Sequence, residues 1–299
     1  LAASIRDRLA GILLSQSVDI LDRHIGTPED LDLGCRIAFA FRKGPLELMR
    51  DLGTTECTRI LKQFQQERPG MPTPKQDRAA YQAFHRFVLV DDVDAGDGRV
   101  VKVITLRRPE ALNAIHDEMT GEILAVIRKF EQAPGVAGFV STGYGTRAFS
   151  AGADIGRFPS MLGDKHQSAE YARACSRLLV HLDTCKKPVI AALNGMALGG
   201  GLELAIRCHG IVATHNTWMQ FPEITLGIVP GIGAMVVPYR RWPEAASTFN
   251  LMLTRAEKLT AEAATEQMTI PVAVLLLGFL VLIAYPAVQQ ITTVSNAVP

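Results

Sequence analysis

The chain has 299 residues and a formal net charge of +1, with 48% hydrophobic and 20% charged residues. This composition is typical of a globular protein with one large domain or two ordinary ones. The balanced charge, without a basic run, argues against nucleic acid as a partner. Five scattered cysteines without a CxxC pair argue against a disulfide framework and a zinc site, and favour a reducing cytoplasm.

Residues 1–66 are expected to form a small all-α segment. Apolar side chains recur there at helical spacing, as in Ile5, Leu9 and Ile12. Thr27 followed by Pro28 is typical of a helix cap and first helical residue, and Gly44-Pro45 indicates another helix start. These signals predict a group of helices before the first strand.

Residues 67–86 are predicted to be a linker, because three prolines within residues 69–74 cannot continue a helix. From residue 87 to about 264 the pattern predicts an α/β domain with a largely buried sheet. Turn residues at 94–98 favour a hairpin between its first two strands. The expected strands are 88–90, 100–106, 138–140 and 188–192, and the expected helices include 117–132 and 166–183.

The tail, residues 265–299, is unusual because no charged residue follows Glu266. Residues 268–288 are almost wholly apolar and, at roughly 20 residues, long enough to cross a bilayer. Three interpretations compete: a translation artefact such as a frame change, a membrane helix, and a buried core helix. We favour the artefact, since Pro271 and Pro286 bracket the apolar span and a terminal segment seldom has neighbours on every side.

The most informative segment is 187–204, where a strand leads into three glycines and a helix expected to begin near Leu202. Glycines let a ligand approach the backbone, and amides at a helix N-terminus favour developing negative charge. The Gly200 amide could thus stabilise an oxyanion, with Glu203 projecting from the same helix start. The simpler interpretation is a tight packing loop whose Glu complements the helix dipole.

Two further segments favour the same chemistry. In 148–155, small residues would let the Ala151 amide pair with that of Gly200, although an ordinary turn with Asp154 as a helix cap explains the pattern equally well. Glu223 lies between apolar neighbours, where desolvation would raise its pKa towards useful acid–base values. The alternative for Glu223 is an exposed loop residue.

These three segments, together with 108–115 after the strand 100–106, resemble the crotonase (enoyl-CoA hydratase/isomerase) family in order and spacing. The resemblance covers about residues 87–264. It implies a fold class of α/β, a crotonase-type ββα spiral domain preceded by a small all-α segment. It also implies a trimer-type homo-oligomer that binds an acyl-CoA substrate in a bent shape.

The resemblance also implies roles for individual residues. The thioester oxygen would lie between the amides of Ala151 and Gly200, and Glu203 and Glu223 would hold the water that adds to the double bond. Since family members that only shift a double bond often keep one glutamate, the pair favours hydration. Neither a metal nor a redox cofactor is required. The other expected substrate-binding positions are Ala111, Leu112, Gly152, Ala153, Asp154, Gly199 and Gly231, the last through its backbone to the water.

One departure from the family pattern leaves other reactions open. Residues 233–241 replace the usual Gly-Gly-Thr-Gln-Arg-Leu type run after the second glutamate. The alternatives are a double-bond isomerase or ring-opening acyl-CoA hydrolase and, from another class, an inactive or membrane-tethered acyl-CoA-binding remnant.

The N-terminal zone resembles the helical C-terminal domain of 3-hydroxyacyl-CoA dehydrogenases, through residues 25–34 and 40–48; a generic helical pair is the alternative. No GxGxxG strand–helix unit precedes it, so NAD binding and dehydrogenase activity are not expected from this chain alone. The resemblance implies a fragment of a bifunctional dehydrogenase–hydratase.

The remaining polar residues are weaker candidates. His116 follows the loop 108–115 and could lie near a ligand phosphate, but solvent exposure is the favoured expectation; His209 is expected to be structural or exposed. Arg107, Arg108 and Lys187 could neutralise CoA phosphates, although exposed basic residues are common.

Overall fold

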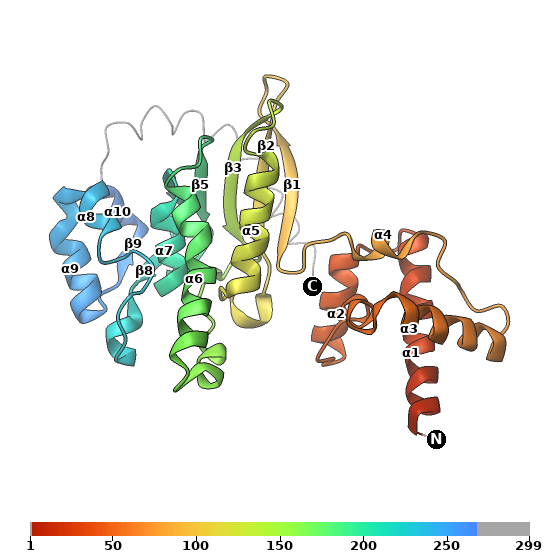
Figure 1. Cartoon of the computed structure of the whole chain (residues 1–299). Coiled ribbons are helices and arrows are strands. Elements are labelled where there is room, and N and C mark those ends of the chain that lie inside the picture. The colour runs from red at the N-terminus through yellow and green to blue at the C-terminus, as the bar shows by residue number, and fades with distance from the viewer. Residues whose placement is uncertain (1, 268–299) are drawn as a thin grey trace. The chain divides into compact units, whose positions relative to one another are not determined.

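The computed structural model describes residues 2–267. The chain divides into two compact units between Arg86 and Phe87, shown in Figure 1. Our three interpretations of the apolar stretch 268–288 concern residues outside the described part. Among the described residues, no helix is both long enough and apolar enough to cross a membrane.

The first unit is entirely helical, as expected. Thr27 caps its second helix by accepting the Asp30 amide, and Pro45 occupies the first turn of the third, so both predicted helix starts are confirmed. The four helices are α1 (Ala2–Asp22), α2 (Pro28–Ala38), α3 (Pro45–Glu67) and α4 (Arg78–Gln82). The buried core between them consists of Leu14, Val18, Leu21, Leu46, Met49, Cys57, Leu61 and Tyr81.

Asp32 joins the second and third helices of this unit. Its buried carboxylate accepts the amides of Leu46 (2.7 Å) and Glu47 (3.0 Å) in the first turn of α3. These amides have no intrahelical partner, so Asp32 supplies acceptors that the α3 backbone lacks. Burial raises the pKa of Asp32, and the two amides partly offset that rise.

The stretch predicted as a linker lies against the helical unit. The Ser15 hydroxyl donates to the carbonyl of Pro72 at 2.6 Å, and the buried Tyr81 donates to Asp22 at 2.7 Å. Residues 67–86 therefore contribute a helix and a core side chain to the first unit.

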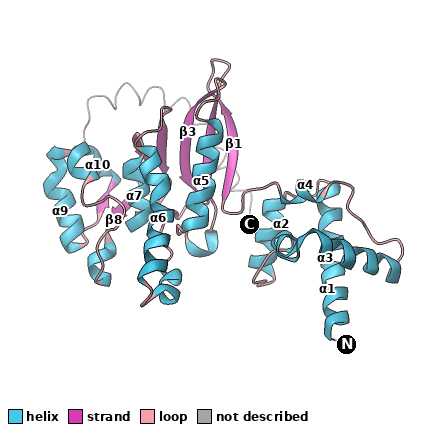
Figure 2. Ribbon diagram, viewed as in Figure 1, coloured by secondary structure: helices cyan, strands magenta, loops and turns pink. Residues whose placement is uncertain are grey.

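The second unit is built on a five-stranded sheet in the order β1-β2-β3-β5-β7 (Figure 2). The first two strands form the predicted hairpin, and the later pairs are parallel, with crossovers between them. These strands are β1 (Val88–Asp94), β2 (Val100–Leu106), β3 (Val136–Gly143), β5 (Val189–Leu193) and β7 (Gly210–Ala213).

The second unit also contains a sheet of four short strands in the order β4-β6-β8-β9. Its first three strands each follow a strand of the large sheet, because β4 comes after β3, β6 after β5, and β8 after β7. This repetition confirms the expected ββα spiral. The strands are β4 (Ala148–Ser150), β6 (Met196–Leu198), β8 (Trp218–Gln220) and β9 (Leu259–Thr260).

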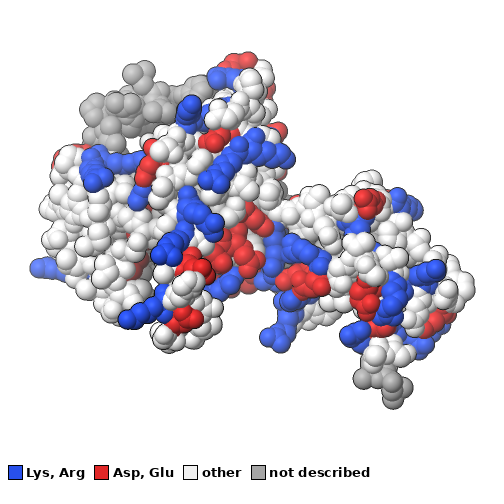
Figure 3. Space-filling view, in the orientation of Figure 1, with Lys and Arg blue, Asp and Glu red and all other residues white. Residues whose placement is uncertain are grey.

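Helices pack around both sheets and bury a core that includes Phe139, Phe149 and Phe221. Each such side chain contributes roughly 1.5–3 kcal/mol by leaving water. Acidic and basic side chains are interspersed on the face in Figure 3, which matches the near-zero net charge. The helices are α5 (Asp117–Phe130), α6 (Lys165–Leu182), α7 (Gly199–Arg207), α8 (Val237–Arg241), α9 (Ala246–Arg255), α10 (Ala261–Gln267) and the 3₁₀ turns η1 (Pro109–Ala111), η2 (Ile155–Met161), η3 (Pro222–Leu226) and η4 (Pro243–Ala245).

Candidate active site

The start of α7 is the centre of the candidate site. The helix begins at Gly199, three residues before the expected start near Leu202, and no side chain caps it. Its first-turn amides therefore lack intrahelical partners, and that of Gly200 is among them. Gly199 has a φ of +42°, and a Cβ there would lie 2.6 Å from Oε1 of Glu223. The backbone of α7 thus approaches the second glutamate closely.

In the short segment that follows β4, the backbone amide available to a ligand is not the Ala151 amide that we expected. The Ala151 amide donates to the Leu112 carbonyl at 3.0 Å, so it is already committed to a backbone acceptor. Ala153 forms a parallel bridge with Ile115 through the Gly152 carbonyl and the Asp154 amide. In a parallel bridge of this kind, the N–H of the central residue points away from its partner.

The Ala153 nitrogen lies 3.4 Å from the position that a Cβ on Gly200 would occupy. Ala153 is therefore better placed than Ala151 to act with Gly200 as an amide donor, which corrects our expectation for Ala151. The physical reason is hydrogen bonding. The Ala151 amide already donates to the Leu112 carbonyl, whereas the bridge between Ala153 and Ile115 uses the amides of Ile115 and Asp154 and leaves the Ala153 amide uncommitted.

Glu203 projects from the second turn of α7 and is buried, with 2% of its surface exposed. Its Oε1 accepts the amides of Ile232 (2.9 Å) and Ala234 (3.0 Å). Burial raises the pKa of Glu203, while these amides oppose the rise by stabilising the charged form. Ile232 and Ala234 were not among the residues predicted from sequence. They lie about 30 positions after Glu203, and no sequence pattern indicates this contact.

Glu223 lies in η3, directly after β8, and is also buried. Burial raises its pKa to about 7, and repulsion from the Glu203 charge adds to the rise. Its Oε2 has no hydrogen-bond partner among the described residues. A carboxyl group of this kind can hold or release a proton near neutral pH, and it has an oxygen available to a ligand. The alternative of an exposed loop glutamate is therefore wrong.

The loop 107–115 is held by Asn113, whose side chain donates to the carbonyls of Tyr144 (3.1 Å) and Ala148 (2.9 Å). Leu112 and Asn113 both adopt positive φ, at +49° and +58°. This loop carries the expected contacts Ala111 and Leu112, and the Leu112 carbonyl accepts the Ala151 amide. The loop is therefore anchored to the strand that bears Ala153.

The basic candidates are engaged within the protein. Arg108 pairs with Asp154 at 3.0 Å, and Lys187 donates to the carbonyls of Ala133 and Val136. Arg107 is buried with its guanidinium over the Tyr144 ring. These contacts give all three side chains structural roles.

Two histidines are also structural. His116 is buried rather than exposed, and its Nδ1 accepts the Met119 amide at the start of α5. Burial, followed by nearby arginines, lowers the pKa of His116 to about 4, so it is neutral at pH 7. The His209 ring accepts the Val189 amide at 3.1 Å.

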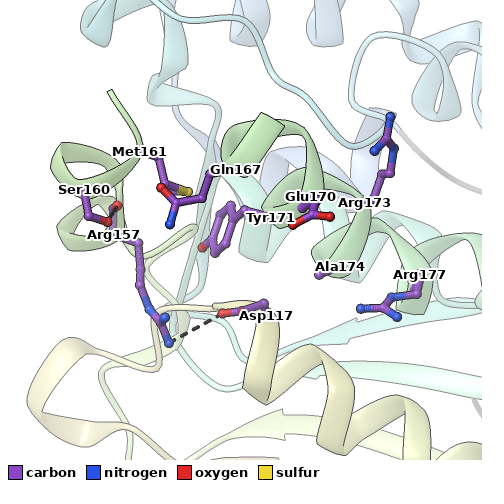
Figure 4. Close-up of a pocket in the computed structure, with 10 residues that line it drawn as sticks. All are labelled: Asp117, Arg157, Ser160, Met161, Gln167, Glu170, Tyr171, Arg173, Ala174 and Arg177. Carbon is purple, nitrogen blue, oxygen red and sulfur yellow. Dashed lines mark hydrogen bonds and ion pairs between the residues drawn. The ribbon is translucent and has the colours of Figure 1, made fainter. Parts of the chain in front are cut away.

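A pocket of about 690 Å³ lies beside η2, α6 and the first residue of α5 (Figure 4). Asp117 and Arg157 form an ion pair in it at 3.5 Å, and Arg173 and Glu170 line its exposed side. None of the glutamates and glycines of the candidate site lines it. The pocket is therefore a neighbour of the site, since η2 begins two residues after Ala153, and not the reaction centre.

The structure thus brings together most of the residues expected at the site. Gly152 is adjacent to the α7 start, because a Cβ on it would lie 3.0 Å from the Leu198 carbonyl. Asp154 instead holds Arg108, and Gly231 lies on an exposed loop next to Ile232. The group that can act on a ligand consists of the Ala153 and Gly200 amides and the Glu203 and Glu223 carboxyl groups.

Curated proteins of similar sequence are enoyl-CoA hydratases. Enoyl-CoA hydratase, mitochondrial, from Pongo abelii is 41% identical over 138 residues, covering 46% of each chain. Short-chain-enoyl-CoA hydratase from Clostridium acetobutylicum is 38% identical over 133 residues, covering 44% of this chain and 50% of its own. The chain therefore spans about half the length of the curated relatives it matches.

Solved structures show the same fold. The enoyl-CoA hydratase from Thermoplasma volcanium superposes with a TM-score of 0.55 at 29% identity, covering 62% of this chain and 70% of its own. The Bacillus anthracis enoyl-CoA hydratase gives a TM-score of 0.55 at 25% identity, with 69% and 76% covered.

Two family patterns match the sequence in succession. The C-terminal domain of 3-hydroxyacyl-CoA dehydrogenase matches residues 5–90, which confirms the resemblance of the helical unit. The enoyl-CoA hydratase/isomerase pattern matches residues 97–293, well over half of the chain. The chain belongs to the enoyl-CoA hydratase/isomerase family.

Proposed function

We propose that this chain is an enoyl-CoA hydratase, a hydro-lyase that adds water across the 2,3 double bond of an enoyl-CoA thioester in β-oxidation-type metabolism. One observation carries the proposal. Two buried carboxyl groups, Glu203 and Glu223, lie at the same helix start as Gly200, and the Ala153 nitrogen is 3.4 Å from the position that a Cβ on Gly200 would occupy. The names of the curated relatives support the same reaction.

The first step is binding of the thioester carbonyl. Its oxygen accepts the amides of Ala153 and Gly200, and the dipole of α7 adds positive potential there. Polarisation draws electrons from the double bond and makes C3 electrophilic. These donors are fixed by the backbone, so little reorganisation accompanies the reaction.

The second step moves two protons. Glu203 in its ionised form takes a proton from the water that attacks C3, while its Oε1 stays held by two amides. Glu223, with its pKa near 7, delivers a proton to C2 from the unpartnered Oε2. The water adds as OH to C3 and H to C2. The step leaves Glu203 protonated and Glu223 ionised, and transfer of the proton from Glu203 to Glu223 through solvent restores the starting state. The chemistry calls for neither a metal nor a redox cofactor, and NAD has no role in it.

The test is hydration of crotonyl-CoA, followed as loss of the enoyl thioester's ultraviolet absorbance. We expect turnover by the parent and a fall in kcat of roughly 10²–10⁴-fold in each of Glu203→Gln and Glu223→Gln, because each removes one acid–base group. Glu118→Gln, an exposed glutamate in α5, is the control and should keep parental activity.

Two other outcomes decide between the alternatives. Retained hydration in both variants contradicts the proposal. A folded parent that binds acyl-CoA without turnover favours an isomerase, a ring-opening hydrolase or a non-catalytic acyl-CoA-binding remnant.

The wider setting is part of the same proposal. We place the protein in the cytoplasm, because its five cysteines are all free and buried, and we propose a trimer-type homo-oligomer with acyl-CoA as substrate. Nucleic acid and membrane are not proposed as partners.

A further inference from the structure

A second cluster of polar side chains lies outside the candidate site and consists of Glu131, His181 and Cys185. Glu131 caps the C-terminus of α5, His181 lies in the last turn of α6, and Cys185 follows that helix. One oxygen, nitrogen or sulfur atom from each lies within 4.8 Å of the others. His181 Nε2 is 2.9 Å from Glu131 Oε2, although the two residues are 50 positions apart. The fold therefore assembles three metal-ligand types that sequence spacing did not reveal.

The surroundings favour a cation. Figure 1 draws α5 and α6 side by side, and the contact between Glu131 and His181 shows that their C-terminal ends meet. The C-terminus of each helix carries a partial negative charge of roughly half an electron. The Glu131 carboxylate adds to that potential. A protonated His181 would neutralise this potential without a metal, and the Cys185 thiol lies within 4.8 Å of the same two ligand atoms.

We propose that Glu131, His181 and Cys185 bind a divalent transition metal ion of the zinc class. A tetrahedral site with metal–ligand distances of about 2.0–2.3 Å separates its ligand atoms by roughly 3.3–3.6 Å. The three ligand atoms lie within 4.8 Å of one another, and His181 Nε2 and Glu131 Oε2 are 2.9 Å apart, so the observed separations bracket that range. Sulfur and imidazole ligands select zinc-class ions over magnesium or calcium, and water completes the fourth position.

The balance of charge and protons is consistent with this site. Binding displaces the thiol proton of Cys185, and the thiolate and the Glu131 carboxylate then neutralise the two positive charges of the ion, with His181 as a neutral ligand. The bound ion would join the C-terminal ends of α5 and α6.

The test uses the full chain and zinc alone, with affinity measured by competition against a chromophoric chelator. We expect one equivalent of zinc in the parent. Cys185→Ser and His181→Gln should each weaken binding beyond the roughly 10–100-fold that loss of an outer-shell partner causes. Cys175→Ser is the matched control, because Cys175 is also a buried cysteine but lies within α6 and outside the cluster. This variant should bind zinc as the parent does. Cobalt substitution should give thiolate-to-metal absorption in the parent and in Cys175→Ser only.

Absence of saturable binding, or equal loss in Cys175→Ser, would overturn the proposal, as would cobalt binding without thiolate absorption. Circular dichroism and Tm without metal verify that each variant is folded. If Cys185→Ser does not fold, His181→Gln and Glu131→Gln decide the question. None of these readouts depends on the proposed hydratase activity.

Discussion

At the scale of single residues, Glu223 shows how the fold sets the chemistry of one carboxyl group. The side chain is 8% exposed, its Oε2 has no partner among the described residues, and Glu203 adds like charge nearby. Desolvation and repulsion both favour the protonated form. A group that is half protonated near neutral pH is suited to donate a proton.

The pH dependence of hydration should report this carboxyl group. Because the proposed donor is protonated Glu223, kcat/KM should fall as pH rises through about 7. The measurement is initial rates of crotonyl-CoA hydration between acidic and alkaline pH, with Glu118→Gln as the reference variant. A rate that stays constant or rises across neutral pH contradicts Glu223 as the proton donor.

The same group should lower stability at high pH. Its pKa is about 7 in the folded chain and ordinarily 4.5, so the folded state binds more protons between these values and loses stability as pH rises through 7. Glu223→Gln removes the buried charge and should be more stable than the parent above pH 7, by on the order of 3 kcal/mol.

Urea denaturation at pH 5 and pH 8 measures this difference. The advantage of Glu223→Gln should be small at pH 5 and large at pH 8. An advantage independent of pH would mean that the buried charge is not its source.

Both glutamates could be proposed from sequence because three segments together resemble one family, although each segment alone also fits a structural interpretation. The choice between Ala151 and Ala153 could not be made from sequence, because it depends on which amides the hydrogen bonds to Leu112 and Ile115 engage. His116 was misjudged for a similar reason, since a partner at Phe87, whose ring packs edge-on against it, lies distant in sequence. The local sequence pattern can indicate which residues belong to a site. Contacts with residues distant in sequence decide which backbone amides are available and which side chains are buried.

At the scale of elements, the contact between α7 and β4 fixes the amide pair. A Cβ on Gly201 would lie 2.6 Å from the Cβ of Ser150 and 2.9 Å from its carbonyl oxygen. The helix therefore lies as close to the strand as backbones allow. Strand and helix positions were predicted well from periodicity, but this approach distance appears only in the structure.

Gly201→Ala should separate the two elements. The added methyl group should cost about 1–3 kcal/mol by overpacking and should lower kcat by displacing the Gly200 amide. Gly121→Ala is the matched control: this site in α5 is open and should gain roughly 0.5–1 kcal/mol. Thermal unfolding and hydration rates test both variants, and an unchanged kcat in a folded Gly201→Ala protein contradicts the proposed packing role.

At the scale of the whole molecule, the two units have separate hydrophobic cores, and the candidate site belongs to the second unit alone. Every residue of the candidate site lies in the second unit, whereas Asp32 holds together two helices of the first. The division of the chain was visible in sequence as a change from helical periodicity to alternating strands and helices. The packing of residues 67–86 onto the helical unit was not, because their prolines resemble those of a free linker.

Asp32→Ala should therefore damage the first unit alone. Two buried amides would lose their acceptor, at about 1–3 kcal/mol for each unsatisfied group, while kcat for hydration should remain at the parental value. Asp51→Ala, which removes an exposed pair with Lys43, should change stability by at most about 1 kcal/mol. Calorimetry and hydration assays test this, and a large loss of kcat in Asp32→Ala contradicts the assignment of the candidate site to the second unit alone.

The repetition of the spiral has a consequence for inheritance. Ala153, Gly200 and Glu223 each follow a strand of the small sheet, on three successive turns of the chain. In the mechanism proposed above, the first two turns bind the thioester carbonyl and the third delivers a proton, so carbonyl binding and proton delivery lie on separate turns. From that mechanism we expect substitutions within residues 218–233 to alter proton delivery without removing the Ala153 and Gly200 amides, so related chains can differ in their reaction while sharing one way of binding the thioester.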